Sequence, residues 1–355
     1  MQDYINEAVD LLKKIIAIPS YSGGEGNRAD FIYNYLTDKG LAVERVKNNL
    51  ITGVYPFSDS TPVLMLNTHI DTVLPSSGYT LDPFDPQVRD GRIYGLGSND
   101  AGASVVSMTA ALLFFKDNPG ELPFNLTLLL SAEEENSGPS GVTLALKSIN
   151  KADSIIVGEP TNMKCASAER GLLVIDGTAE GVSGHAAREE GINSIYIALE
   201  DIVKIKNHKF SKISKLMGEV KMTVTQISAG HQHNVIPEIC KFVIDIRPTD
   251  VYDNNEIVQE LKKLVKSKLT PRNLSNRSSS TPEGHPLLKC AQELGVDCYT
   301  SPTTSDWMRH SLPAIKMGPG DSSRSHRADE YICIEELKEG INGYINFIKH
   351  LKLKQ

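Results

Sequence analysis

The sequence predicts an α/β domain with a mostly parallel sheet, into which a smaller α+β domain is inserted. Two observations carry this prediction. In the first half of the chain, short and wholly apolar runs alternate with helical segments, as in parallel strands that are buried on both faces. In the middle of the chain the strands become half polar, which is typical of a sheet with one exposed face. The first pattern returns toward the C-terminal end.

The N-terminal part of the chain predicts two helices before the central sheet begins. Residues 3–17 place their apolar side chains on one helical face, and Pro19 follows as a stop. Residues 27–38 form a second predicted helix, which Gly40 closes and a strand at 41–46 follows. A small, mostly apolar run then predicts a buried helix, and three apolar runs predict strands of a parallel sheet. The helix is 101–115, and the strands are 63–66, which should end at Asn67, 124–130 and 155–157.

With 355 residues the chain exceeds the size at which single hydrophobic cores usually stop growing, so we expect two domains. The half-polar strands are 172–177, 219–227 and 241–246, and the helical segments between and after them are 192–205 and 255–268. A stretch rich in Ser, Asn and Pro at 270–281 predicts the return to the first domain, where 286–294 and 334–352 are helical and 314–317 is a strand. We expect a main domain of residues 1–170 and 277–355, and an inserted domain of residues 171–276.

Composition excludes several classes of function. The formal net charge is −7 and the basic residues are dispersed, whereas a nucleic acid partner would require a concentrated basic face. No stretch approaches the roughly 18 to 20 apolar residues of a membrane span, and residues 1–20 lack the basic and apolar regions of a signal peptide. The five cysteines are scattered without a C-x-x-C pair. We therefore expect a cytoplasmic protein with reduced thiols and neither a nucleic acid nor a membrane as partner.

Acidic residues and histidines follow the predicted buried strands or lie in glycine-rich turns. The carboxyl ends of parallel strands meet at one edge of a sheet, and ligands bind there. His69 and Asp71 follow the first strand, and this spacing allows the carboxylate to orient the imidazole. Alone, H-x-D is weak evidence, because a turn cap or chance gives the same pattern. The whole set is His69, Asp71, Asp100, Glu134, Glu135, Glu159 and His326.

This set has the chemistry of a site for two divalent metal ions. Imidazoles and carboxylates are ligands of borderline ions, and a bridging carboxylate can hold two such charges close together. Asp100 lies among small neighbours that allow close approach, and a glutamate left over could serve as a base. The alternative for Glu133–Glu135 is a solvated loop or a helix N-terminus, where the dipole favours negative charge.

Nine motifs in order extend this set over nearly the whole chain. They are I-P-S-Y-S at 18–22, T-H-I-D-T-V at 68–73, G-S-N-D-A-G-A at 97–103, A-E-E-E at 132–135, G-E-P-T at 158–161, G-V-S-G-H-A-A at 181–187, N-V-I-P-E at 234–238, D-I-R at 245–247 and S-H-R-A-D-E at 325–330. Together they resemble the M20 metallopeptidases and N-acyl amino acid deacylases, a family that includes acetylornithine deacetylase and succinyl-diaminopimelate desuccinylase.

The resemblance implies a dizinc catalytic domain with two Zn²⁺ per chain, which Co²⁺ can replace. By position, it makes His69 and Glu159 ligands of one ion, Glu135 and His326 ligands of the other, Asp100 the bridge, Asp71 the group that orients His69, and Glu134 the general base and acid. The family usually has D-E-E where this chain has three glutamates, so a shift to Glu133 as base and Glu134 as ligand stays open. The chain also has Ser98-Asn99 before Asp100, where the family often has Arg-Gly.

For the inserted domain, the resemblance implies a lid that also makes a homodimer. His185 would reach the active site of the neighbouring protomer and polarise the scissile carbonyl. Its alternative is an ordinary surface or core histidine. Asn234, Arg247 and the Gly320 turn would face the substrate, although Arg247 could equally pair with Asp245 or Asp250.

The expected reaction is metal-dependent hydrolysis of the amide bond of a small N-acyl amino acid. Within the family, the length and motif wording are closest to the acetylornithine deacetylase branch, which implies N-acetyl- or N-succinyl-ornithine as substrate and a place in arginine biosynthesis. The alternatives are a succinyl-diaminopimelate desuccinylase or a small dipeptidase. A non-catalytic binding protein on the same scaffold is a remote alternative, because ligands and base are all present.

Overall fold

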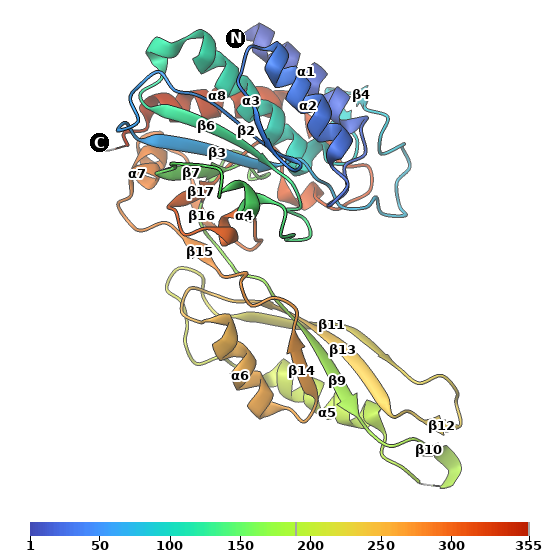
Figure 1. Ribbon diagram of the computed structural model, residues 1–355. Helices are drawn as coiled ribbons and strands as arrows, with labels where there is room; N and C mark the ends of the chain where they lie inside the picture. The colour runs from blue at the N-terminus through green and yellow to red at the C-terminus, as the bar shows by residue number, and fades with distance from the viewer. Residues whose placement is uncertain (189, 354–355) are drawn as a thin grey trace. The chain divides into compact units, whose positions relative to one another are not determined.

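A computed structural model describes residues 1–188 and 190–353 of the chain, so residues 189 and 354–355 of the two expected domains lie outside it. The chain divides into two compact units, shown in Figure 1. The first unit comprises Met1–Ser167, Ser280–Tyr299 and Ser305–Gln355. The second comprises Ala168–Ser279 and Thr300–Thr304. The unit that carries both ends of the chain is therefore built from three separate segments.

A large sheet forms the centre of the first unit. Its strands within the described residues are β1 (Glu44–Val46), β2 (Asn49–Val54), β3 (Val63–His69), β6 (Asn125–Ser131), β7 (Ser154–Val157), β8 (Cys165–Glu169), β15 (Ser279–Ser280), β16 (Cys298–Ser301) and β17 (Ala314–Lys316). They follow the order β1-β2-β6-β3-β7-β17-β8-β15, with β16 beside β8. The central strands β6, β3, β7 and β17 run parallel, whereas β1, β2 and β8 pair antiparallel with their neighbours. The predicted α/β class with a mostly parallel sheet is confirmed.

Helices cover both faces of this sheet (Figure 1). They are α1 (Gln2–Ile16), α2 (Gly26–Asp38), α3 (Ala103–Asp117), α4 (Val142–Ala145), α7 (Pro286–Glu293) and α8 (Ile334–His350), with the short turns η1 (Ser98–Gly102), η2 (Pro119–Glu121), η4 (Asp306–Arg309) and η5 (Ser322–Arg324). Helix α3 is buried from Ala103 to Phe115 between the sheet, α1 and α8. On the opposite face, Trp307 of η4 packs with α4 and with Met65 and Leu129 of the sheet. No helix in the described parts of the chain is long and apolar enough to cross a membrane.

A smaller sheet also belongs to the first unit. It consists of β4 (Gln87–Arg89), β5 (Arg92–Tyr94) and β18 (Tyr331–Cys333), in the order β18-β5-β4. Its pairings are antiparallel. This sheet joins the loop before η1 to the segment that leads into α8, so it links the surroundings of Asp100 to those of His326.

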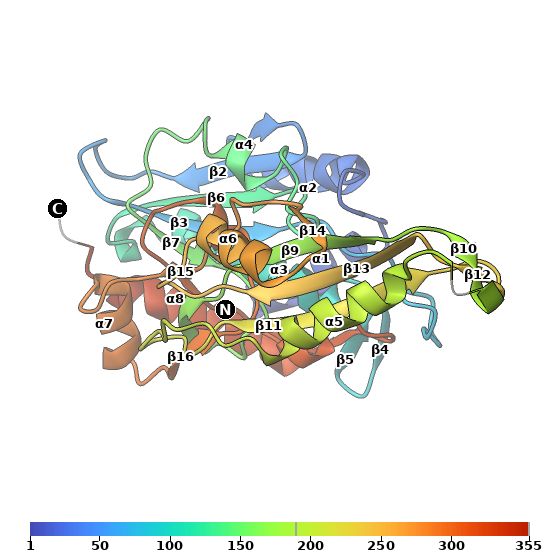
Figure 2. The ribbon, with the colours of Figure 1, turned by 90° about the horizontal axis from the view of Figure 1, so that it is seen from below.

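The second unit is an antiparallel sheet with two helices on one face. Its strands β9 (Leu173–Glu180), β11 (Lys221–Ala229), β13 (Ile239–Arg247) and β14 (Lys268–Pro271) follow the order β11-β13-β9-β14. Figure 2 shows α5 (Ser194–Asn207) and α6 (Asn254–Leu264) in front of these strands. Alternate side chains of β9 and β13 are buried under the helices, as the half-polar pattern predicts. A two-stranded ribbon of β10 (Gly184–His185) and β12 (Val235–Ile236) and the turn η3 (Ala186–Arg188) extend from this sheet.

The strand that begins at Val63 is longer than predicted. Its polarity at Asn67 suggested an end there, but β3 continues to His69 and every residue of it is buried. The polar side chains are tolerated because they find partners: Asn67 donates to the Ser131 hydroxyl at 3.1 Å, and the Thr68 hydroxyl donates to the Gly158 carbonyl at 2.8 Å. His69 is therefore the last residue of the strand and not part of the following loop.

Candidate metal centre

Three neighbouring parallel strands deliver side chains to one edge of the central sheet. His69 ends β3, Glu134 and Glu135 follow β6, and Glu159 follows β7. Since β6, β3 and β7 are adjacent and parallel, their carboxyl ends lie side by side. Asp100 reaches the same edge from η1, which leads into α3. Ligand sites are common at this edge of a sheet because loops from several strands converge there.

Asp100 lies between two histidines. Its Oδ1 is 3.2 Å from Nε2 of His69, and its Oδ2 is 3.9 Å from Nε2 of His326. Ligand atoms of His69, Asp100 and Glu135 all lie within 4.8 Å of one another. The two oxygens of one carboxylate thus face different imidazoles, which is the arrangement that a bridging carboxylate needs.

Each histidine has a second carboxylate beside it. Glu159 Oε1 lies 4.0 Å from Nε2 of His69, and Glu135 Oε2 lies 3.0 Å from Nε2 of His326. The structure therefore brings together all five residues that the sequence predicted as ligands. They form one pair, His69 and Glu159, and a second pair, His326 and Glu135, with Asp100 between the pairs.

The carboxylates of this cluster are buried close to one another, and their pKa values respond. Burial, together with the charge of Asp100, raises the pKa of Glu159 to about 8. Burial also raises the pKa of Glu135, and it raises that of Glu134 well above the usual value, with Glu159 and Glu135 adding to the effect. Such a group of buried acids is costly without positive charge. The donor set and its charge therefore fit divalent cations.

The two histidines of the cluster also have raised pKa values. The hydrogen bond with Glu135 raises the pKa of His326 to about 9, against the effect of burial. For His69, burial alone would lower the pKa, but hydrogen bonds with Asp100 and Asp71 raise it well above its usual value. In the absence of a metal ion, the His326 imidazole is therefore protonated at neutral pH.

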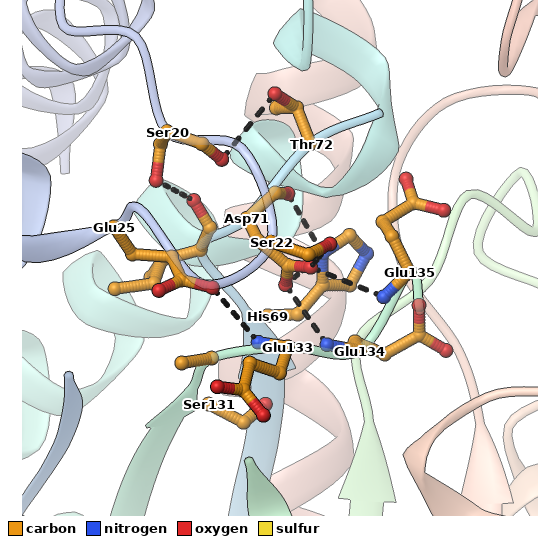
Figure 3. Close-up of polar contacts among 12 residues, drawn as sticks. Ser20, Ser22, Glu25, His69, Asp71, Thr72, Ser131, Glu133, Glu134 and Glu135 are labelled. Atoms are coloured by element: carbon orange, nitrogen blue, oxygen red, sulfur yellow. Dashed lines mark hydrogen bonds and ion pairs between the residues drawn. The ribbon is translucent and has the colours of Figure 1, made fainter. Parts of the chain in front are cut away.

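Asp71 connects the end of β3 to the acidic turn after β6, as Figure 3 shows. It is fully buried, and its carboxylate accepts the Ser22 hydroxyl at 2.6 Å and the backbone N–H groups of Glu134 and Glu135 at 3.1 Å each. Nδ1 of His69 lies 3.0 Å from the Asp71 carbonyl and 3.4 Å from its Oδ1. Both are acceptors, so Nδ1 carries a proton and Nε2 is directed toward Asp100.

The three consecutive glutamates point in different directions. The Glu133 carboxylate accepts the backbone N–H of Ser140 at 2.8 Å. Figure 3 shows this side chain directed away from those of Glu134 and Glu135. Glu135 contacts His326, and the charge of Glu134 interacts with His69 and Glu159. This arrangement supports Glu134 and Glu135, and not Glu133 and Glu134, as the pair that faces the cluster.

Three further buried side chains hold this edge of the sheet in place, and none of them was predicted as a site residue. The Glu330 carboxylate accepts the N–H groups of Gly97, Asn99 and Asp100 at 3.0, 2.8 and 2.8 Å. The Arg28 guanidinium is 3% exposed and donates to the carbonyls of Ile18 and Ile70. Asp306 accepts the hydroxyl of Ser131, the last residue of β6. Glu330 closes the S-H-R-A-D-E motif, but no local pattern shows which backbone groups it meets.

The comparison with known proteins identifies the family. The model of Peptidase family M20/M25/M40 matches residues 65–350, which is most of the chain. The chain belongs to this family. The resemblance in the motifs, and the expectation of an enzyme of this kind, are thereby confirmed.

Curated relatives of this M20 chain carry more than one activity. A Peptidase M20 domain-containing protein of Schizosaccharomyces pombe is 29% identical over 96% of this chain and 84% of its own length. An acetylornithine deacetylase of Buchnera aphidicola is 26% identical over 93% of this chain and 94% of its own length. A succinyl-diaminopimelate desuccinylase of Xanthomonas oryzae is 27% identical over 94% of this chain and 96% of its own length. The relatives are hydrolytic enzymes, and so is this chain, but their identities are too similar to single out a substrate.

Solved structures agree on the fold of the M20 chain. A tripeptidase of Staphylococcus aureus superposes with a TM-score of 0.78 at 19% identity and covers 98% of each chain. A dinuclear metal binding peptidase of the M20 family from Bacillus subtilis has a TM-score of 0.75 at 14% identity, again with 98% of each chain covered. At these identities the likeness shows the shared fold, and it adds that one neighbour binds two metals.

The predicted substrate contacts of the M20 chain lie in two places. Gly320 is in the first unit at φ +88, where an added Cβ would also collide with the Asn99 side chain, so the turn favours glycine. His185 and Asn234 lie together in the second unit, where the Ala186 N–H donates to the Asn234 carbonyl at 3.0 Å. The Arg247 guanidinium donates to both oxygens of Asp245, at 2.8 and 3.0 Å. The structural pairing that was left open as an alternative for Arg247 is thus present.

Proposed function

We propose that this protein hydrolyses the amide bond of an N-acylated amino acid with two zinc ions bound at the cluster around Asp100. The strongest support is the position of Asp100 between two histidine–glutamate pairs, each of which offers one imidazole and one carboxylate. His69 and Glu159 would hold one ion, His326 and Glu135 the other, and Asp100 would contact both. When bound, such ions activate a water molecule and polarise a carbonyl oxygen. Co²⁺ prefers similar ligands and should replace zinc.

Glu134 has the properties of the base in this reaction. It is buried beside the cluster, and burial raises the pKa of its carboxyl above the usual value, which makes it a stronger acceptor for a proton. It would take a proton from the attacking water and deliver it to the nitrogen of the departing amine. Asp71 fixes the turn that carries it through two backbone hydrogen bonds. Glu133 is turned away and would have no part in proton transfer.

For the substrate, we propose N-acetyl- or N-succinyl-ornithine, which would place the enzyme in arginine biosynthesis. Curated acetylornithine deacetylases support this choice, but a succinyl-diaminopimelate desuccinylase is equally similar. The latter activity is therefore the second candidate, and a small dipeptidase is the third. All five cysteines are free, which agrees with a reducing compartment such as the cytoplasm.

A panel of purified substrates separates these candidates. The zinc-loaded protein is assayed for kcat/KM with N-acetyl-ornithine, N-succinyl-ornithine, N-succinyl-diaminopimelate and a set of dipeptides. We expect one of the two ornithine derivatives to exceed every other compound by at least about tenfold, since buried polar groups of a site discriminate strongly. Comparable values for all compounds would refute a biosynthetic deacylase. Binding without turnover of any compound would favour the non-catalytic alternative.

We also propose that the protein is a homodimer formed through the second unit. Tyr196, Leu199 and Val203 lie on one face of α5 and are 67, 47 and 55% exposed, and β11 lies at an edge of the four-stranded sheet. An apolar stripe beside a sheet edge suits a two-fold contact with a second copy. Light scattering should give twice the chain mass, and Leu199→Glu should give the monomer, while Leu74→Glu, at an exposed position of the first unit, should not.

His185 would then act on the substrate bound to the partner protomer, as a donor to the scissile carbonyl. In this chain it is exposed, and its Nδ1 accepts the N–H of Ala187 at 3.1 Å, which leaves Nε2 as the atom for that role. Mixing the inactive variants His185→Ala and Glu134→Ala tests the proposal. If His185 acts across the dimer, exchange of protomers restores up to about a quarter of wild-type activity. If it acts within one chain, the mixture stays inactive.

A further inference from the structure

We propose that Glu25 is a positioning residue that sets the direction of Glu134 and Glu135 by holding the turn in which they lie. The proposal rests on the proposed function, because it assigns Glu25 its effect through the base and through a ligand of the second ion. Glu25 lies just before α2 and outside the motifs that point to the metal centre. Its carboxylate is fully buried.

The contacts of Glu25 reach three segments of the first unit. Oε1 accepts the backbone N–H of Gly23 at 2.6 Å and that of Glu133 at 3.1 Å, while Oε2 accepts the Asn48 amide at 2.8 Å. An acidic residue at the start of a helix ordinarily accepts N–H groups of that helix. Glu25 is the N-cap of α2, yet its side chain makes no such bond. Through these hydrogen bonds, its buried carboxylate supports the acidic turn after β6 and not its own helix.

The turn that Glu25 holds has an unfavourable backbone conformation. Glu133 has φ +54, in the left-handed region that residues with a side chain seldom adopt. Such a conformation persists only where surrounding contacts determine it. Here Glu25 accepts the N–H of Glu133, and the Glu133 carboxylate accepts the N–H of Ser140. The residue with this conformation directly precedes the proposed base.

Two buried carboxylates together bind three successive peptide groups. Glu25 accepts the N–H of Glu133, and Asp71 accepts those of Glu134 and Glu135, as Figure 3 shows. The orientation of each peptide group decides where the adjoining side chains point. Without Glu25 the N–H of Glu133 loses its acceptor, so its peptide group can reorient and Glu134 loses the fixed position that proton transfer requires. Glu135 loses part of its support as a ligand, although Asp71 still holds its N–H.

Three variants of Glu25 separate positioning from a general effect on stability. Glu25→Gln keeps an oxygen that can accept the N–H groups of Gly23 and Glu133, and it removes the charge. Glu25→Asp keeps the charge but is one methylene shorter and does not reach Glu133. Glu25→Ala removes both, and Glu25→Asp takes its place in the experiment if Glu25→Ala does not fold. The matched control is Asp201→Ala, which removes a fully buried carboxylate that accepts the N–H groups of Lys266 and Ser267 in the second unit.

The experiment measures kcat, KM, melting temperature and the affinity for the second Co²⁺ ion, the latter by titration of the metal-free protein. Loss of a group that orients metal ligands costs roughly 10 to 100-fold in affinity or activity. We expect Glu25→Ala and Glu25→Asp to lose kcat by about this factor with little change in KM, and to bind the second ion more weakly. Glu25→Gln should stay within about threefold of the wild type in both. Asp201→Ala should have a lower melting temperature and an unchanged affinity for both ions.

Three results would overturn the proposal. One is wild-type kcat and ion affinity in Glu25→Ala. Another is a loss in Glu25→Gln as large as that in Glu25→Ala, because that would make the charge and not the hydrogen bond responsible. The last is an equal loss of ion affinity in Asp201→Ala, which would reduce the effect to stability. If the wild type hydrolyses none of the compounds in the panel, the proposed function fails, whereas the Co²⁺ titration still decides the role of Glu25.

Discussion

The carboxylate of Glu330 accepts the backbone N–H of Asp100 at 2.8 Å, across a separation of 230 residues in the chain. The same carboxylate accepts the N–H groups of Gly97 and Asn99. Asp100 is the residue that faces both histidines, so the segment after η5 fixes the backbone of the proposed bridge. His326 and Glu330 come from that one segment, which links the two sides of the metal centre.

Replacing Glu330 should therefore destabilise the first unit and the metal centre together. Glu330→Ala leaves three buried N–H groups without an acceptor, and a buried unsatisfied group costs roughly 1 to 3 kcal/mol. We expect a fall of more than about 2 kcal/mol in the free energy of unfolding measured with urea. Glu330→Gln keeps one oxygen for Asn99 and Asp100 and should lose less. Equal stability of Glu330→Ala and the wild type would contradict this role.

Asp71 should matter to both metal sites and not only to His69. Asp71→Ala frees Nδ1 of His69 and removes the acceptor for the N–H groups of Glu134 and Glu135. Loss of such support costs roughly 10 to 100-fold in metal affinity or activity. Chelator competition should show a lower affinity for both ions, while the circular dichroism spectrum stays unchanged. Weakening of one ion alone would limit Asp71 to the orientation of His69.

Metal binding should release protons. In the metal-free protein His326 has a pKa of about 9 and Glu159 one of about 8, so both carry protons at pH 7. Ligands bind divalent ions in their deprotonated forms, so the apparent affinity should rise as the pH rises from 6 toward 9. Calorimetry at pH 7 in buffers of different ionisation enthalpy should count at least two protons released per chain, one each from His326 and Glu159. A count near zero would contradict the protonation of the metal-free cluster.

The two adjacent glutamates should differ sharply in their effect on catalysis. Glu134→Gln removes the proposed base and should lower kcat by about 10² to 10⁴-fold with both ions retained. Glu133→Gln is the matched control, because Glu133 accepts the Ser140 N–H and points away from the cluster. It should change kcat by less than about tenfold. The reverse result would move the base to Glu133, the alternative that the sequence left open.

There is a physical reason why the sequence could predict that these residues lie close together. His69, Glu135 and Glu159 follow apolar runs that only a doubly covered sheet buries, and the ends of adjacent parallel strands must meet. Both the apolar runs and the family motifs are local patterns, so they can be recognised in the sequence without knowledge of distant side chains. The prediction that β3 ends at Asn67 was wrong. Asn67 and Thr68 are buried within the strand, because their side chains have partners that lie far away in the chain.

The supporting residues could not be predicted in this way. Glu25, Arg28 and Glu330 act through hydrogen bonds to backbone groups of other segments, and a backbone N–H or carbonyl carries no signature in the sequence. The same limit applies to Arg247, for which a substrate carboxylate and Asp245 are chemically equivalent partners. The structure shows the pair with Asp245. Such choices are decided by tertiary contacts and not by local pattern.

The central claim is that two bound metal ions at the Asp100 cluster are required for hydrolysis. The most direct test removes metal with a chelator and then adds zinc back stepwise, while the zinc content per chain and the turnover of the best substrate in the panel are measured together. We predict no turnover without metal and full recovery at about two zinc ions per chain. Undiminished turnover by protein that contains no metal would contradict the account.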